Sequence, residues 1–144
     1  MKDGRMRRVH EPAIQDQLGG HRCYGCGPLN ENGLQIKSYW DGEETVCHFE
    51  PKPHHVAGPD FLNGGIIATI IDCHCVNTAM AAGYREEGRA LGSDPKIWCV
   101  TGSLQVSYLK PTPMDAPVEL RARVIDRTGR KTRVACSLYA KGEE

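Results

Sequence analysis

An acidic side chain lies in the longest apolar stretch of this sequence. Asp72 follows the apolar residues 66–71, and a further apolar stretch continues to Ala82. This pattern predicts a helix over residues 64–82 that is buried on most of its faces. An unpaired carboxylate at such a place costs several kcal/mol, so Asp72 needs a partner or a chemical task. We therefore consider it a candidate nucleophile or general base.

The start of the same predicted helix offers a second chemical group. Gly64 and Gly65 open the helix, and Asn63 before them is a favourable N-cap residue. The first N–H groups of a helix have no partner inside it, and the helix dipole gives this end a partial positive charge. Such groups stabilise the negative charge that develops on a carbonyl oxygen under attack. An acid and an anion-stabilising helix end in one segment predict chemistry at a carbonyl.

The spacing of these two groups indicates that one chain alone cannot bring them together. Eight residues separate Gly64 from Asp72, which corresponds to about 12 Å along a helix. Catalytic groups must lie within about 3–3.5 Å of the reacting atoms. Two antiparallel helices from two chains would bring Gly64 of one chain to Asp72 of the other. We therefore expect a site shared between subunits.

The elements that must hold these groups follow from the hydrophobic pattern. Alternating apolar and polar residues predict two strands before the helix and three after it. Gly83 is the expected end of the helix, and prolines make residues 51–62 an irregular loop. This order predicts an α+β fold in which an antiparallel β-sheet wraps around one long central α-helix. The predicted strands are residues 34–40, 44–50, 97–109, 117–126 and 131–141.

Length and composition agree with a single globular domain. The chain has 144 residues with 18 basic and 18 acidic side chains, and its mean hydropathy is −0.46. The balanced charge gives no overall attraction to nucleic acid or to a membrane surface. The basic N-terminus is not followed by an apolar region, so we expect no secretory signal and a cytoplasmic protein. We predict a polar, partly disordered lead at residues 1–20 and one domain at residues 21–144.

The seven cysteines are odd in number, which favours free thiols in a reducing compartment. Cys23 and Cys26 form the only C-x-x-C motif. A zinc site needs two further ligands, and the sequence has no second C-x-x-C motif and no suitably spaced histidine pair. A thioredoxin-type redox role lacks the flanking strand and helix. We therefore expect a turn with reduced thiols and no metal. Other ligands are available in principle: Cys47, His48, Cys73, His74 and Cys75.

Four ordered pieces of the sequence, within about residues 23–140, are similar to those of one known family. They are Cys23-Tyr24-Gly25-Cys26-Gly27-Pro28 with Asn32-Gly33-Leu34, Gly58-Pro59 with Asn63-Gly64-Gly65, Val100-Thr101-Gly102-Ser103-Leu104 with Tyr108-Leu109-Lys110-Pro111, and Arg127-Thr128-Gly129-Arg130. Together they resemble the hotdog-fold acyl-CoA thioesterases of the phenylacetic-acid-degradation (PaaI-like) type. The resemblance implies a homodimer or homotetramer with the active site between subunits. It also implies an acyl-CoA substrate, with coenzyme A present only as part of that substrate.

The resemblance assigns roles to three residues. In the family, the acidic residue at the position of Asp72 acts as nucleophile or general base. The glycine at the position of Gly64 donates its N–H to the thioester carbonyl. A serine or threonine on the following strand, here Thr101, often assists. The implied reaction is hydrolysis of a thioester to free acid and CoA.

The sequence departs from the family before the two glycines. The family usually has histidine there, and this chain has Asn63, which can cap the helix but cannot carry a proton near neutral pH. A polar residue upstream commonly orients the water or the carbonyl, and His55 is near that place. We expect Asn63, Gly65 and His55 to contact substrate. Arg130 and Lys131, if they are not simply a solvated hairpin, would meet the phosphates of CoA.

Two other functions remain open from the sequence. Loss of the family histidine is also consistent with a non-catalytic acyl-CoA-binding hotdog protein. A hydratase or dehydratase on the same fold pairs an aspartate with a histidine at a spacing that is absent here. Asp72 and His74 lie about 200° apart around a helix, so we assign His74 to packing or to an interface. His48, on a predicted strand, is expected to be structural.

Overall fold

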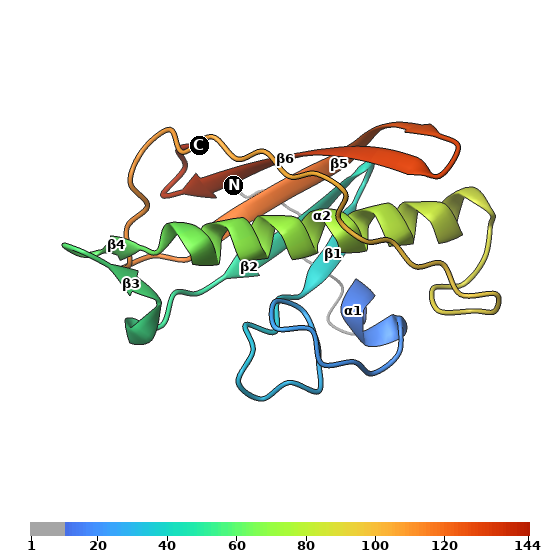
Figure 1. Ribbon diagram of the computed structural model, residues 1–144, viewed down its shortest axis with the longest axis horizontal. Coiled ribbons are helices and arrows are strands. Elements are labelled where there is room, and N and C mark those ends of the chain that lie inside the picture. Colours follow the sequence, from blue (N-terminus) through green and yellow to red (C-terminus); the bar gives the residue numbers. More distant parts are fainter. Residues whose placement is uncertain (1–10) are drawn as a thin grey trace.

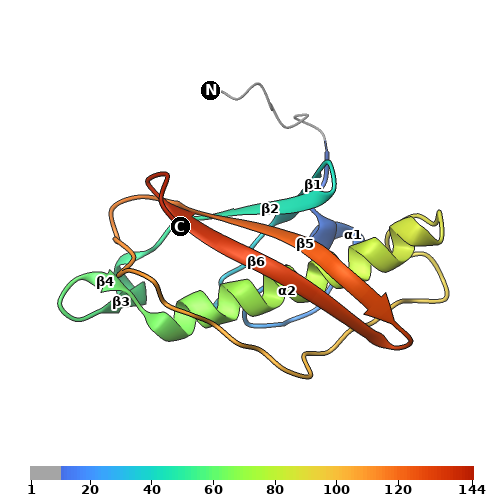
Figure 2. The ribbon, with the colours of Figure 1, turned by 90° about the horizontal axis from the view of Figure 1, so that it is seen from above.

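The computed structural model describes residues 11–144, in which four antiparallel strands form one sheet around a long helix (Figure 1). The sheet has the order β1-β2-β5-β6. In Figure 1, β1 and β2 lie behind the helix α2, and Figure 2 shows β5 and β6 passing over it. This is the predicted α+β hotdog arrangement. The elements are β1 (Ser38–Asp41), β2 (Glu44–Phe49), α2 (Gly64–Glu86), β5 (Val118–Thr128) and β6 (Lys131–Ala140).

The β5–β6 hairpin is the longest part of the sheet. Its strands pair in antiparallel register, and Gly129 in the turn has a φ of +60°, which glycine adopts without strain. Successive side chains of a strand point to opposite faces. Val118, Leu120 and Ala122 accordingly face the core and are fully buried, whereas the residues between them are partly exposed. The alternation predicted for this strand is therefore confirmed.

The central helix continues beyond its predicted end. Gly83 lies inside α2, and a Cβ atom there would come within 3.2 Å of Ile97 Cδ1, so this glycine serves close packing and not helix termination. The helix ends before Gly88, which has a φ of +65° and donates its N–H to the carbonyl of Arg85. The prediction that Gly83 ends the helix was wrong because close packing, as well as termination, can require a glycine.

Both hydrophobic clusters of the core include residues of α2. Ile70 packs in the cluster that contains Leu120 of β5, and Met80 and Tyr84 pack in a second cluster with the short helix α1 (Ile14–Gln17). By length and composition alone α2 could cross a membrane, but half of its apolar window is buried inside the fold. The burial is that of a core helix packed against a sheet.

The N-terminal part of the described chain is packed against the core. Ala13, Ile14 and Leu18 are buried in and around α1. The lead expected at residues 1–20 therefore differs from the structure over residues 13–18, because the apolar side chains there cover the end of α2. Residues 1–10 of that expected lead lie outside the described residues.

A small hairpin precedes the helix, where an irregular loop was expected. The short 3-10 helix η1 (Pro53–His55) leads into β3 (Val56–Ala57), which pairs with β4 (Phe61–Leu62). The N–H of Asn63 then donates to the carbonyl of His55 over 2.9 Å. This pairing fixes the chain immediately before the first residue of α2.

Residues 97–109, predicted as a strand, form no strand within residues 11–144. The segment runs along the side of α2 that the sheet leaves uncovered, and it crosses in front of the helix in Figure 1. Side chains tie it to the helix: the Ile97 N–H donates to the Tyr84 hydroxyl over 2.8 Å, and the Tyr108 hydroxyl donates to the Gly64 carbonyl over 2.8 Å. A strand requires a backbone partner, and residues 11–144 provide none for this segment.

Candidate functional site

Asp72 lies on the side of α2 that faces residues 97–109. Its Oδ1 atom accepts a hydrogen bond of 2.5 Å from the Thr101 hydroxyl. The two side chains that the resemblance assigned to catalysis are therefore in direct contact. Asp72 is partly exposed in the single chain, which corrects the expectation of a buried carboxylate. The sheet covers only the opposite side of the helix.

The helix start has the geometry expected of an anion-stabilising end. Asn63 Oδ1 accepts hydrogen bonds from the N–H groups of Gly65, over 2.8 Å, and Ile66, over 3.1 Å. A Cβ atom at Gly65 would come within 3.0 Å of this oxygen, so a glycine fits the cap closely. The N–H of Gly64 has no acceptor among residues 11–144. It thus remains available to a ligand, and Asn63 caps the helix as predicted.

Tyr108 is a contact of the helix start that the sequence analysis missed. Its hydroxyl donates to the Gly64 carbonyl, and its ring lies 3.6 Å from the place where a Gly64 Cβ would be. No spacing rule pairs these residues, because Tyr108 reaches the helix only through the path of the 97–109 segment. Thr101 and Tyr108 together fix this segment opposite Asp72 and Gly64.

A single chain keeps the acid and the helix start apart. α2 is continuous from Gly64 to Glu86, so Gly64 and Asp72 remain about 12 Å apart along its axis. One carbonyl group cannot contact both. The expectation of a site shared between subunits was based on this separation, which the structure retains.

The other predicted substrate contacts lie at different places. His55 is 4% exposed, its Nδ1 accepts from the Lys52 N–H over 2.9 Å, and burial lowers its pKa. Arg130 and Lys131 are exposed at the turn of the β5–β6 hairpin. This turn lies beside the C-terminal end of α2 (Figure 2), far from Gly64 of the same chain.

His74 is a structural residue, as its position on the helix suggested. It is fully buried, its Nδ1 lies 2.7 Å from Ser38 Oγ, and its Nε2 lies 3.1 Å from Thr45 Oγ1. The Thr45 hydroxyl also lies 2.6 Å from the Thr78 hydroxyl. Burial lowers the pKa of His74 to about 4. This network joins α2 to β1 and β2 and holds the imidazole neutral.

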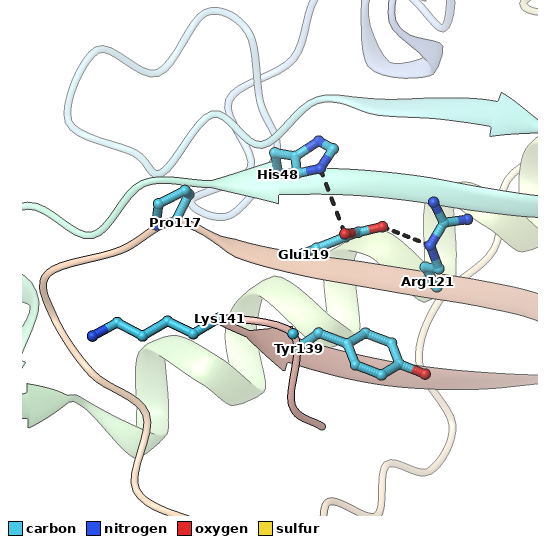
Figure 3. Close-up of a pocket in the computed structure, with 7 residues that line it drawn as sticks. His48, Pro117, Glu119, Arg121, Tyr139 and Lys141 are labelled. Atoms are coloured by element: carbon cyan, nitrogen blue, oxygen red, sulfur yellow. Dashed lines mark hydrogen bonds and ion pairs between the residues drawn. The ribbon is translucent and has the colours of Figure 1, made fainter. Parts of the chain in front are cut away.

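A hollow of about 360 Å³ lies on the face of the sheet turned away from α2 (Figure 3). Arg121 on this face is bound by carboxylates: its Nη1 lies 2.9 Å from Asp41 Oδ2, and its Nε lies 2.6 Å from Glu119 Oε2. His48, 3.9 Å from Glu119, completes the row of side chains in Figure 3. The arginine charge is therefore already neutralised, and Asp72 does not line this hollow.

The C-x-x-C motif has a third thiol beside it. The sulfur atoms of Cys23, Cys26 and Cys73 lie within 4.8 Å of one another. The hydrogen bond from Cys73 lowers the pKa of Cys26 to about 6, and the pKa of Cys73 is raised by the same contact. The sequence could not reveal this meeting, because Cys73 is far from the motif along the chain.

Comparison with known proteins points to one family. The family model of the thioesterase superfamily matches residues 60–144. Acyl-coenzyme A thioesterase THEM4 of Rattus norvegicus is 29% identical over 114 residues, which cover 78% of this chain and 44% of that protein. The protein of the same name from Xenopus laevis is 32% identical over 93 residues, which cover 65% of this chain and 36% of that protein. The chain spans less than half the length of these relatives.

Solved structures are similar as well. A thioesterase superfamily protein from Shewanella loihica PV-4 is 42% identical, with a TM-score of 0.58, and the match covers 72% of this chain and 78% of that one. A second thioesterase superfamily protein has a TM-score of 0.66 at 21% identity. The match covers 96% of this chain and 68% of that protein's chain. The second likeness is one of fold alone.

Proposed function

Because the chain belongs to the thioesterase superfamily, we propose that it hydrolyses an acyl-CoA thioester to a free acid and CoA. Asp72 is the nucleophile or general base, and the Gly64 N–H of a second subunit holds the oxyanion. The observation that carries this proposal is the hydrogen bond between Thr101 and Asp72 on the uncovered side of α2. An acid held in this way keeps one carboxylate oxygen free for a water molecule or for the substrate.

The proposed reaction has two steps at the thioester carbon. The oxygen of a water molecule, or of Asp72 itself, forms a bond to this carbon, and the carbonyl electrons move onto the oxygen held by the Gly64 N–H. When water attacks, Asp72 takes up its proton. The intermediate then collapses, the C–S bond breaks, and a proton neutralises the departing thiolate of CoA. An intermediate covalently linked to Asp72 would be hydrolysed by a second water molecule.

A homodimer is part of the proposal, and the 97–109 segment supports it. Its backbone forms no ladder within residues 11–144, and it carries half of the exposed large hydrophobic side chains of the described chain. A second copy of the segment, paired antiparallel, would supply the missing ladder and cover these side chains. The same pairing would place two α2 helices antiparallel, with each Gly64 facing the other subunit's Asp72. The side chains are Trp98, Val100, Leu104, Tyr108 and Leu109.

The antiparallel dimer also gives Arg130 and Lys131 a role. They lie beside the C-terminal end of α2, 14 residues and about 21 Å along the axis beyond the Asp72 that would face the other subunit's Gly64. Their positive charges would then be remote from the Gly64 that binds the carbonyl, at a place that only the distal part of a long substrate could reach. We propose that they meet the phosphates of CoA, and that Asn63, Gly65 and His55 border the acyl-carrying part of the site.

The test is CoA release from a panel of short, medium, long and aromatic acyl-CoAs, separated by chromatography. Asp72→Asn removes the acid, and we expect it to abolish release without changing the fold or the oligomeric state. Asp115→Asn is the matched control, because Asp115 is exposed and pairs with Lys141 over 3.0 Å. Hydrolysis by Asp72→Asn at the wild-type rate would overturn the assignment.

The panel also distinguishes the two other functions. Asn63 Oδ1 is occupied by the helix cap, which suits a protein that binds acyl-CoA without turnover. Tight binding with no release from any ester would favour that protein over a hydrolase. Addition of water to an enoyl-CoA, with the thioester left intact, would indicate a hydratase.

A further inference from the structure

Three thiols from two distant parts of the chain meet beside the catalytic side of α2. Cys23 and Cys26 come from the loop that follows α1, and Cys73 comes from the helix. All three are free, and within residues 11–144 they are the only group of three metal-ligating side chains this close together. Thiolate sulfur is a preferred ligand of zinc and of similar soft cations.

The spacing of the sulfur atoms fits one tetrahedral ion. Zinc–sulfur bonds of about 2.3 Å at tetrahedral angles place two sulfur ligands about 3.8 Å apart. The Sγ atoms of Cys23 and Cys73 lie 3.7 Å apart. The third sulfur is within 4.8 Å of both. A small inward movement of Cys26 would complete three corners of a tetrahedron.

The loop that carries the motif is fixed by its backbone. The Gly27 N–H donates to the Cys23 carbonyl over 2.8 Å, and the Leu34 N–H donates to the Tyr24 carbonyl over 2.7 Å. A Cβ atom at Gly25 would lie 2.4 Å from the sulfur of Cys73. Only a glycine lets the loop approach the helix this closely. The three thiols are therefore held together by the chain and do not depend on flexible side chains.

A buried amide beside the cluster provides a second, independent observation. Asn77 is fully buried, and its Nδ2 donates to the Cys73 carbonyl over 2.7 Å. Among residues 11–144, Asn77 Oδ1 is the one buried side-chain oxygen or nitrogen without a partner. When water, and not His21, is the fourth ligand of the ion, that water would supply the missing donor.

The exposed side of the cluster leaves room for a fourth ligand. Cys23 is exposed, and His21 lies next to it, with Nδ1 3.3 Å from the Cys23 nitrogen. The imidazole could turn its other nitrogen toward the sulfur atoms. Without it, water would complete the coordination, as in other sites with three protein ligands.

We propose that Cys23, Cys26 and Cys73 bind one zinc ion, or another thiophilic divalent cation, with His21 or water as the fourth ligand. Each thiol loses its proton when the ion binds. The ion would tie the loop that follows α1 to α2 at the residue next to Asp72. The sequence predicted no metal because two ligands were evident in the motif and the third is contributed by the fold.

Cobalt binding tests the site with a readout that does not depend on hydrolysis. Reduced, metal-free full-length protein is titrated with Co²⁺, and we expect the thiolate charge-transfer and tetrahedral d–d absorption bands to saturate at one ion per chain. Zn²⁺ should displace the cobalt. Cys23→Ser, at an exposed position, should fold normally and weaken binding at least tenfold.

Cys136→Ser is the matched control, because its thiol lies beside Cys75 on another side of the helix. The control should bind as tightly as the wild type, and so should Asp72→Asn if the site is separate from catalysis. Absence of the thiolate bands, or an identical titration for Cys23→Ser, would overturn the proposal. A Cys23–Cys73 disulfide in air-exposed protein, combined with no metal uptake after reduction, would overturn it in favour of a redox pair.

Discussion

The hydrogen bond between Thr101 and Asp72 permits a test at a single residue. Thr101→Val keeps the shape of the side chain and removes the hydroxyl that donates to Asp72 Oδ1 over 2.5 Å. Hydrogen bonds to charged groups contribute roughly 1.5–3 kcal/mol, so we expect kcat to fall about 10-fold to 100-fold with little change in KM. Steady-state kinetics on the best substrate of the panel measures this, and Thr101→Ser should restore most of kcat. A valine variant with wild-type kcat would show that Thr101 does not position the acid.

Asn63 is open to a second single-residue test, of stability. Asn63→Ala removes the acceptor for the N–H groups of Gly65 and Ile66. Loss of such a cap costs about 1 kcal/mol, so the thermal midpoint should fall by a few degrees. Asn63→Asp keeps the acceptor and should retain the midpoint in the same calorimetric scan. Equal midpoints for the alanine variant and the wild type would contradict the role of the cap.

At this scale the resemblance predicted that Thr101 and Asp72 belong to one site, and the structure brings these two side chains into contact. Asp72 and Gly64 were predicted from residue type and position in the helix, whereas Thr101 was predicted only from the resemblance. The exposure of Asp72 could not be predicted, since it depends on which side of α2 the sheet covers. Tyr108 was missed for a similar reason, because its contact with Gly64 depends on the path of an exposed segment.

At the scale of elements, the buried network between α2 and the first two strands makes stability depend on pH. The pKa of His74 is about 4 in the folded chain, against 6.5 for the ordinary imidazole. As pH falls, His74 therefore binds a proton at a higher pH in the unfolded chain than in the folded chain. Stability should be unaffected above pH 6.5 and should decrease toward pH 4, by up to about 3 kcal/mol.

Denaturant titrations at pH 7 and at pH 4.5 measure this loss. His74→Gln removes the titrating group, so it should be less stable at pH 7 but should lose less stability between the two pH values. The same loss in both proteins would assign the acid sensitivity to other groups.

The sequence predicted most elements, and the exceptions have physical causes. The β1–β2 and β5–β6 hairpins and the central helix follow from local alternation and from the apolar run, although β1 begins at Ser38 and not at residue 34 as predicted. Residues 97–109 have a strand pattern, but a strand forms only where another backbone is available. Gly83 was misread because close packing and helix termination require the same residue type.

At the scale of the whole molecule, the shared site can be tested by mixing two inactive variants. Gly64→Pro removes the N–H group proposed to hold the oxyanion, and proline is well tolerated at the first position of a helix. Asp72→Asn removes the acid. In a mixed dimer one site carries both changes and the other carries neither. After denaturation and refolding together, about one quarter of wild-type activity should return, since half of the dimers are mixed and each has one intact site.

The control for this experiment is each variant refolded alone, which should remain inactive. A mixture that also remains inactive, although mixed dimers are detected by mass spectrometry, would place Gly64 and Asp72 in the same site of one chain. Recovered activity above the level of either variant alone would establish the shared site.

The ties between residues 97–109 and α2 restrict how this part of the chain can evolve. The tied positions span about 30 Å on the helix and about 36 Å on the extended segment, so the segment has little slack. Exposed connections usually accept insertions and deletions. Here one added residue would move at least one of the three hydrogen-bonding side chains out of reach of its partner on α2. It would also turn alternate side chains of the segment to the other face. Homologous chains should therefore vary in residue type along this segment and keep its length. The ties are Ile97 to Tyr84, Thr101 to Asp72, and Tyr108 to Gly64.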